Sequence, residues 1–130
     1  MPLLQDVHVL VVDDEAEVRE VICEILEIYG ATVSSARSGE EAIGLLAARA
    51  PDVIVTDLAM ANGDGFWLLR EVRNRGLLAV PVIAISGHFE QSEQGRVLAA
   101  GFDYLIGKPV QFDDLGRTIA RSIGRGEGAP

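Results

Sequence analysis

Three consecutive acidic residues follow a strongly apolar segment near the start of the chain, where their side chains could do chemistry. Residues 7–12 read VHVLVV, a composition typical of a buried β-strand, and Asp13, Asp14 and Glu15 come directly after them. Ionised carboxylates crowded at the end of such a strand repel one another and resist the loss of their water. A bound cation would offset that cost, so the pattern indicates a metal site.

Polar residues also stand at the ends of three further apolar segments. Asp57 closes the run DVIVTD, Ser86 closes the run VPVIAIS, and Lys108 comes shortly after the run DYLI. In an open parallel sheet, ligands bind beyond the carboxyl ends of the strands. We therefore expect these three side chains to converge with Asp13 and Asp14 at one edge of a sheet.

The residue types at this edge suit the transfer of a phosphoryl group. Mg²⁺ takes one or two carboxylates in proteins, keeps several waters and prefers a phosphate as its remaining partner. Asp57 would present a carboxylate nucleophile beside the cation, while Lys108 and Ser86 would offer a positive charge and a hydroxyl to the phosphoryl oxygens. Catalysis of such a transfer depends mainly on positioning and electrostatics, so no general acid or base is required.

Strands and helices that alternate along the chain would position these residues. Buried strands are predicted at residues 7–12, 52–57, 80–86 and 103–106, and a weaker strand pattern stands at residues 31–36. Helices are predicted by apolar spacing before Gly30, after Ser38, after Gly65, at residues 90–100 and after Val110. This alternation favours right-handed βαβ units, so the predicted fold class is α/β, with a parallel sheet covered by helices on both faces.

Two of the predicted helices carry specific expectations. The first helix is predicted from apolar residues at helical spacing: Val18, Val21, Ile22, Ile25 and Leu26. The helix at residues 90–100 has the weakest pattern, because it contains few large apolar residues and Gly95, which costs about 1 kcal/mol of helix propensity relative to Ala.

Length and composition indicate one acidic globular domain. The chain has 130 residues, a net charge of −9 and no apolar run near the about 20 residues that a membrane span needs. Its charge argues against nucleic-acid binding, because phosphate backbones are bound mainly by Lys and Arg. A single cysteine, Cys23, excludes an intramolecular disulfide or a multi-cysteine zinc site. No secretory signal is recognisable at the start, so a cytoplasmic protein without membrane contact is expected.

The sequence resembles the receiver domains of two-component response regulators over nearly its whole length. The family pattern is an acidic pair, an acceptor Asp, a Ser or Thr and a Lys-Pro pair, matched here by Asp13, Asp14, Asp57, Ser86, Lys108 and Pro109. The resemblance implies a flavodoxin-like (βα)5 fold, a doubly wound parallel sheet with strand order 2-1-3-4-5. It implies a receiver domain at residues 5–124, followed by a Gly-rich tail or shortened linker at residues 125–130.

The resemblance also implies a role for each acidic site residue. Asp57 would be the phosphoacceptor, and Mg²⁺, or alternatively Mn²⁺, would be held by Asp13, Asp14, Asp57 and the backbone carbonyl of Ala59. Asp14 would be the more direct ligand of the acidic pair. We assign Glu15 to the start of the first helix, where a negative charge is favourable, and leave it outside the site.

The remaining implied roles concern the phosphoryl group and the partners. Ser86 and Lys108 would bind phosphoryl oxygens, with Ser86 acting in the switch, and a cis peptide bond is expected between Lys108 and Pro109. The donor would be a sensor histidine kinase or a histidine phosphotransfer protein. A downstream effector or a second copy of the chain would read the switch, and the domain itself would be a signalling module rather than an enzyme.

Four positions depart from the family or stand out beside the site. Leu105 stands three residues before the Lys, where the family usually has the aromatic switch residue. Tyr104 lies one residue before that position, and because side chains alternate along a strand, its ring should point to the opposite face of the sheet. Ala61 stands where a Pro is common. Trp67, beside the inward Phe66, would be exposed, and His88 would be a solvated loop residue near the site.

Two alternative functions remain open at this point. A phosphatase of the haloacid-dehalogenase type would also use Asp57 as nucleophile, but such enzymes place a second Asp two residues later, where this chain has Ala59. An interaction module with the same fold would act without phosphorylation, through Leu105, Trp67 and the last helix. The intact acidic residues favour the phosphorylated receiver over both.

Overall fold

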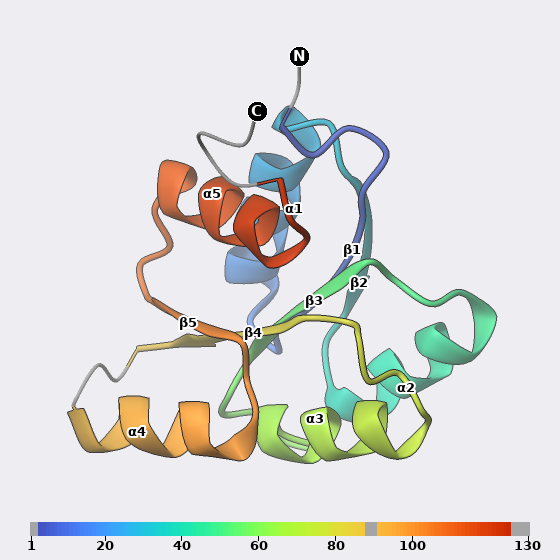
Figure 1. Ribbon diagram of the computed structural model, residues 1–130, viewed down its shortest axis with the longest axis vertical. Coiled ribbons are helices and arrows are strands. Elements are labelled where there is room, and N and C mark those ends of the chain that lie inside the picture. Colours follow the sequence, from blue (N-terminus) through green and yellow to red (C-terminus); the bar gives the residue numbers. More distant parts are fainter. Residues whose placement is uncertain (1–2, 88–90, 126–130) are drawn as a thin grey trace.

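A computed structural model describes residues 3–87 and 91–125 of the chain, in which strands and helices alternate as predicted (Figure 1). The elements are β1 His8–Val12, α1 Ala16–Ile28, β2 Thr32–Ala36, α2 Gly39–Ala48, β3 Val53–Asp57, α3 Gly65–Asn74, β4 Val82–Ser86, α4 Gln91–Ala100, β5 Tyr104–Gly107 and α5 Phe112–Ser122. His88 lies outside the described residues. Within them, no helix has the length and apolar character needed to cross a bilayer.

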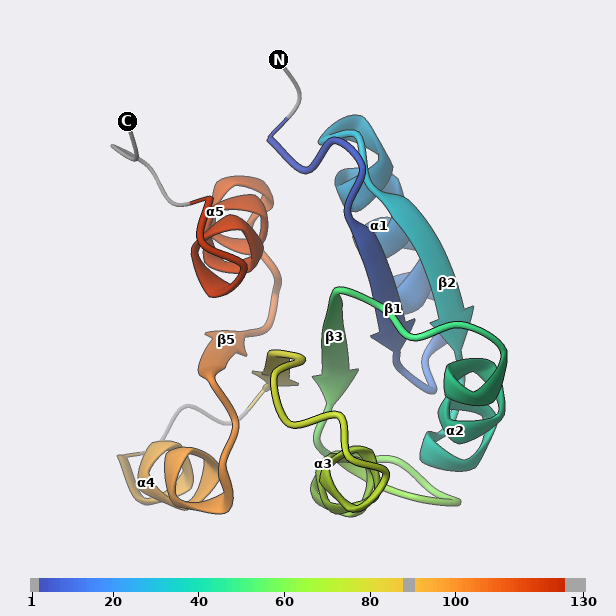
Figure 2. The ribbon, with the colours of Figure 1, turned by 45° about the vertical axis from the view of Figure 1, so that its right-hand side comes forward.

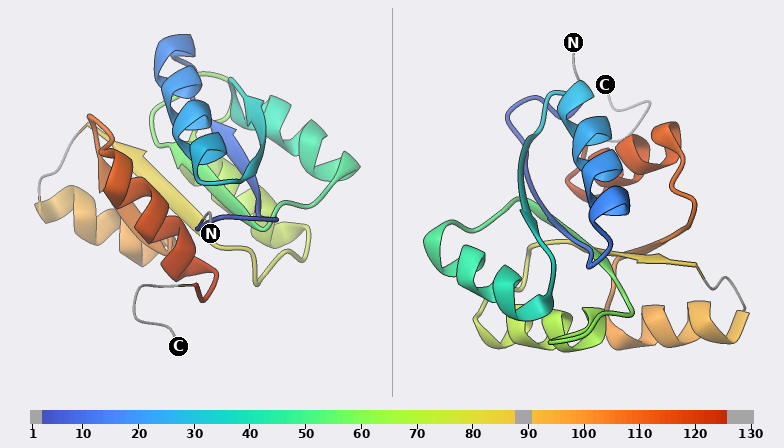
Figure 3. Two further views of the ribbon diagram at one scale, coloured as in Figure 1. Left: turned by 90° about the horizontal axis from the view of Figure 1, so that it is seen from above. Right: turned by 180° about the vertical axis from the view of Figure 1, so that it is seen from behind.

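The five strands form one parallel sheet in the order β2-β1-β3-β4-β5, which confirms the predicted α/β fold and its topology. Figure 1 shows α1 and α5 above the sheet and α3 and α4 below it, and the view from behind in Figure 3 shows the same two layers, with α2 on the side of α3. Because helices cover both faces, every residue of β1, β3 and β4 is buried. The edge strand β2 is only partly buried.

One apolar cluster fills each side of the sheet. The cluster beneath α1 and α5 includes Ile22, Leu26 and Ile119, and the cluster beneath α2, α3 and α4 includes Leu68 and Val97. Each core is therefore assembled from elements that are distant in the sequence. The buried Val97 shows how the weakly patterned helix α4 is attached to the second cluster.

Val21 differs from the other apolar residues at helical spacing in α1, because its side chain is 52% exposed. Ile22, Ile25 and Leu26 are buried and form the inward stripe of α1. Val21 lies at the margin of that stripe, where it lines a shallow groove with Pro109 instead of the core. Its exposure follows from the width of the buried stripe, which the periodicity of the sequence does not specify.

Short polar side chains fix the starts of two helices next to the site. The Ser38 side chain accepts a hydrogen bond from the amide of Glu41 at 3.1 Å, and the Asp64 side chain accepts one from the amide of Trp67 at 2.9 Å. Both are N-cap interactions that satisfy an otherwise unpaired amide of the first helical turn. They explain why α2 and α3 begin at Gly39 and Gly65, within one residue of the positions expected from the sequence.

Candidate functional site

The carboxyl ends of β1 and β3 bring three acidic side chains together. Asp13 and Asp14 follow β1, Asp57 ends the neighbouring strand β3, and each contributes one oxygen to a set that lies within 4.8 Å of one another. The arrowheads of β1 and β3 end close to one another in Figure 2. The structure thus assembles the acidic cluster that the strand-end pattern predicts.

Lys108 reaches this cluster from the end of β5, two strands away from β3. Its Nζ lies 3.2 Å from an oxygen of Asp13, 3.4 Å from an oxygen of Asp57 and 3.7 Å from an oxygen of Glu15. The Lys108 amide donates a hydrogen bond of 2.8 Å to the carbonyl of Ser86, and the peptide bond to Pro109 is cis. One ammonium group therefore faces three carboxylates.

Glu15 lies nearer to the site than its assignment to the helix start implied. It is the N-cap residue of α1, but its side chain makes no capping hydrogen bond and instead lies within ion-pair distance of Lys108. The Glu15 amide donates a hydrogen bond of 2.9 Å to a carboxylate oxygen of Asp13. The run of three acidic residues in the sequence could have indicated that Glu15 belongs to the site. Only the position of Lys108 in the structure shows that Glu15 also faces the cluster.

Burial makes the charges of the cluster costly. Asp13 is 1% exposed and Asp57 6% exposed, whereas Asp14 is exposed. Burial, followed by the negative charge of Asp13, raises the pKa of Asp57, and the charge of Lys108 offsets only part of this shift. Burial alone would lower the pKa of Lys108, but the charges of Asp57 and Asp13 together outweigh it and raise that pKa. Lys108 is therefore a cation at neutral pH.

The residues present fit a magnesium ion. The Oδ2 atom of Asp13 is buried and accepts no hydrogen bond from any residue in the described part of the chain, although Lys108 is near it. The exposed Asp14 borders the same cluster on the solvent side. Carboxylate oxygens with room for water on one side are the ligands that Mg²⁺ prefers. Ala59, the expected carbonyl ligand, lies two residues after Asp57 in the exposed part of the following loop.

Asp57→Asn should raise the free energy of unfolding near neutral pH by about 1–2 kcal/mol in the absence of divalent cations, because it removes a buried charge that is only partly compensated. The folded-state pKa of Asp57 lies above its ordinary value of 3.8, so the penalty of its charge grows as the pH rises through the folded-state pKa. The gain should therefore shrink as the pH falls toward 3.8. Urea unfolding of both proteins at several pH values measures it, and a loss of stability near neutral pH would contradict it.

The other predicted positions lie around this cluster. Ser86 is buried at the end of β4, where β4 pairs with both β3 and β5. Leu105 packs with the cluster beneath α3 and α4, whereas Tyr104 packs with the cluster beneath α1 and α5. The two side chains thus face opposite sides of the sheet, as strand alternation predicts, and the ring of Tyr104 does not occupy the position of Leu105.

Gly65 shapes the site in a way that the sequence reasoning missed. A Cβ atom on this residue would lie 2.6 Å from the carbonyl oxygen of Asp57 and 3.0 Å from the Cα atom of Leu58. Only glycine allows the start of α3 to approach the end of β3 this closely. The Gly-Asp-Gly sequence at residues 63–65 could have indicated this role, because it is typical of a turn before a helix.

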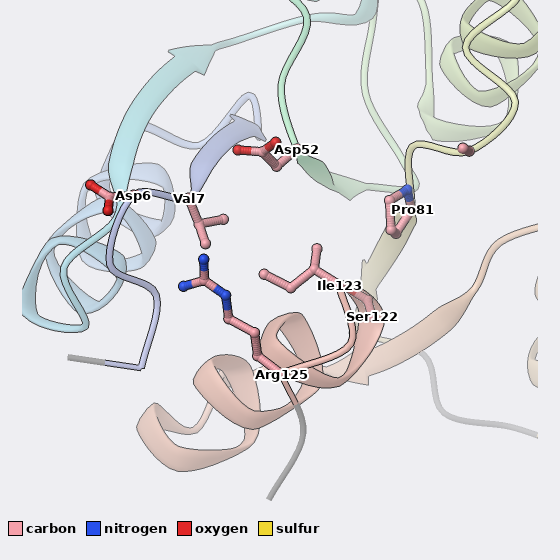
Figure 4. A pocket seen from close by; sticks show the side chains of 8 residues that line it. Asp6, Val7, Asp52, Pro81, Ser122, Ile123 and Arg125 are labelled. Atoms are coloured by element: carbon pink, nitrogen blue, oxygen red, sulfur yellow. The ribbon is translucent and has the colours of Figure 1, made fainter. Parts of the chain in front are cut away.

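A polar pocket of about 440 Å³ lies at the opposite, amino-terminal edge of the sheet (Figure 4). Its lining consists of Asp6, Val7, Asp52, Ala79, Pro81, Ser122, Ile123 and Arg125. The Arg125 guanidinium donates a hydrogen bond of 2.6 Å to the carbonyl of Gln5, and the Asp52 carboxylate accepts one of 2.8 Å from the amide of His8. These groups take part in local structure, and none of the predicted site residues lines this pocket.

Comparisons with known proteins identify the family of the chain. The family model of the response regulator receiver domain matches residues 9–120. The chain is 34% identical over 121 residues to an uncharacterized 14.6 kDa protein of Leptolyngbya boryana, with 92% of each covered. It is 33% identical over 115 residues to the sensor histidine kinase RcsC of Salmonella typhi, covering 88% of this chain but only 12% of the kinase.

A solved receiver-domain structure is also similar to this chain. The receiver domain of the Francisella response regulator 1452 superposes with a TM-score of 0.85 at 30% sequence identity, covering 92% of this chain and 98% of that domain. The family model matches most of this chain. The matched part contains the parallel sheet, the acidic cluster at the ends of β1 and β3, and the lysine after β5. The chain therefore belongs to the family of response regulator receiver domains.

Proposed function

We propose that this chain is a phosphoacceptor of a two-component phosphorelay, with Asp57 receiving the phosphoryl group in the presence of Mg²⁺. The observation that carries the proposal is the convergence of three carboxylate oxygens within 4.8 Å, with the Lys108 ammonium 3.4 Å from Asp57. The domain would comprise residues 5–124 and would be a cytoplasmic signalling module rather than an enzyme. Its donor would be a sensor histidine kinase or a histidine phosphotransfer protein.

The transfer step follows from the positions of these side chains. A carboxylate oxygen of Asp57 forms a bond to phosphorus while the bond between phosphorus and the donor histidine nitrogen breaks, and the nitrogen keeps the electron pair. The Lys108 ammonium would neutralise part of the charge on the phosphoryl oxygens, and the Ser86 hydroxyl would donate a hydrogen bond to them. Asp13, Asp14, Asp57 and the carbonyl of Ala59 would hold Mg²⁺, which supplies positive charge to the phosphoryl oxygens. Water later releases the phosphate from Asp57.

The response to phosphorylation would pass from Ser86 to α4 and β5. A phosphoryl group adds negative charge and acceptor oxygens, so movement of Ser86 toward it would shift the end of β4 and favour one of two arrangements of the domain. Leu105 lacks the aromatic ring that commonly accompanies this step in the family. We therefore propose that α4 and the surface beside Leu105 carry the response to an effector or a second copy of the chain.

Intact mass after incubation with a small phosphodonor such as acetyl phosphate tests this function. The protein should gain one phosphoryl group in the presence of Mg²⁺, gain little without divalent cations, and gain none when Asp57 is replaced by Ala, because only Asp57 provides the nucleophile. Mn²⁺ should substitute for Mg²⁺. Short incubation times are needed because acyl phosphates hydrolyse.

Two results would contradict the proposal. A folded protein that gains no phosphoryl group under any of these conditions would favour an interaction module that acts independently of phosphorylation. Multiple turnover of a phosphomonoester substrate would instead favour a phosphatase with Asp57 as nucleophile. Far-ultraviolet circular dichroism of each variant controls for loss of the fold.

A further inference from the structure

The loop between β3 and α3 forms hydrogen bonds at both of its ends. This loop contains Ala59, whose carbonyl is the expected metal ligand. At the end nearer to Asp57, the Leu58 amide donates to the carbonyl of Ile85 at 3.3 Å, and the Leu58 carbonyl accepts from the amide of Gly65 at 3.0 Å. Between these points, the amides of residues 59–61 donate no hydrogen bond to any other described residue. The position of the Ala59 carbonyl therefore depends on how the rest of the loop is held.

The far end of the loop is fastened to the first turn of α2. The Gly39 amide donates to the carbonyl of Gly63 at 2.9 Å, and the Glu40 amide donates to the carbonyl of Asn62 at 3.2 Å. These amides have no partner within their own helix, so the loop satisfies them. Figure 2 shows the loop running from the end of β3 past the start of α2 before it enters α3.

The indole of Trp67 covers this junction. A Cβ atom on Gly63 would lie 2.7 Å from Cε3 of Trp67, and a Cβ atom on Gly39 would lie 2.9 Å from the same atom. The six-membered part of the ring thus rests directly on both glycines, and Gly63 adopts a φ of 95°, which favours glycine. Trp67 is accordingly half-buried, in contrast to the expectation that it would be exposed.

We propose that Trp67 is a positioning residue for the metal site. By covering Gly63 and Gly39, it protects the two hydrogen bonds between loop and helix from water and restricts the loop whose Ala59 carbonyl would bind Mg²⁺. This role matters here because Ala61 leaves the loop without the conformational restriction that a proline would provide. The inference rests on the proposed function in so far as it concerns Mg²⁺.

Trp67→Leu tests the inference, because leucine keeps an apolar side chain but lacks the ring that contacts both glycines. Mg²⁺ binding measured by calorimetry, without any phosphodonor, should be weakened roughly 10-fold, the lower end of what loss of an outer supporting residue costs a metal site. The amides of Gly39 and Glu40 should exchange with solvent faster than in the wild type. Trp67→Phe, which retains a ring, should show a smaller loss of affinity.

Gly116→Ala is the matched control for stability alone, since Gly116 lies in α5 against Tyr29 and contacts no part of the loop. This variant should lose stability yet keep the wild-type affinity for Mg²⁺. Unchanged affinity in Trp67→Leu, or an equal loss in Gly116→Ala, would overturn the inference and leave the proposed function intact. A wild-type protein that binds no Mg²⁺ would overturn both.

Discussion

Lys108→Met should lower the free energy of unfolding by about 3 kcal/mol near neutral pH without divalent cations and slow phosphorylation of Asp57 by roughly 100-fold. Among the described residues, Lys108 forms the ion pairs of both buried carboxylates, Asp13 and Asp57. Its removal leaves two negative charges close together in a site with little solvent, and this arrangement is strongly unfavourable. The same ammonium would otherwise stabilise the charge on the phosphoryl oxygens.

Mg²⁺ should restore part of the stability that Lys108→Met loses, because a ligand that binds only the folded state stabilises it. Urea unfolding with and without Mg²⁺, together with the rate of phosphoryl gain by intact mass, measures both effects. Arg75→Met is the control, since the ion pair that Arg75 forms with Glu71 is partly exposed and 4.0 Å long, and its loss should cost less than about 0.5 kcal/mol. Similar losses in the two variants would refute the buried-charge explanation.

Gly116→Ala should destabilise the protein by about 2 kcal/mol, although alanine is the better helix former by about 1 kcal/mol. Gly116 is buried in α5, and a Cβ atom there would overlap the ring of Tyr29 at the end of α1. The ring cannot easily move away, because it packs against Phe112 with 4.8 Å between ring centroids and its hydroxyl donates to the carbonyl of Phe112 at 3.3 Å. The contact between α1 and α5 would have to open.

Gly95→Ala is a control for which we expect the opposite effect on stability. Gly95 lies on the exposed side of α4, and a Cβ atom there would meet nothing within 4 Å among the described residues apart from its chain neighbours and the backbone of its own helix. This substitution should therefore stabilise the protein by about 0.5–1 kcal/mol through helix propensity alone. Thermal unfolding of the two variants beside the wild type separates the effects, and stabilisation by both would show that Tyr29 does not restrict Gly116.

The elements that carry the site could be predicted from local patterns. Largely apolar runs predicted β1, β3 and β4, because strands buried on both faces leave few polar positions, and the boundaries of all five strands differ from the structure by at most two residues. Polar residues at the ends of those runs, such as Asp57 and Lys108, predicted convergence because parallel strands place their carboxyl ends at one edge. Topology followed from resemblance to a known family and was confirmed.

Contacts between elements that are distant in the sequence could not be predicted in this way. Glu15 was assigned only to a helix start, yet it lies 3.7 Å from Lys108, because the distance between residues 15 and 108 depends on the packing of α1 and β5. Val21 has the same periodicity as its buried neighbours but lies outside the contact with the sheet. Trp67 was expected to be exposed, and only the proximity of Gly39 and Gly63 explains its burial.

The sequence by itself determined the order of the elements, the α/β class and the set of residues at the carboxyl edge of the sheet, since these depend on local periodicity and on the direction of parallel strands. The tertiary structure decided which charges face one another, how deeply Asp13 and Asp57 are buried, and which side chain covers the loop after β3. Charge interactions and close packing change over a few ångströms, and such distances are fixed only when all elements pack together.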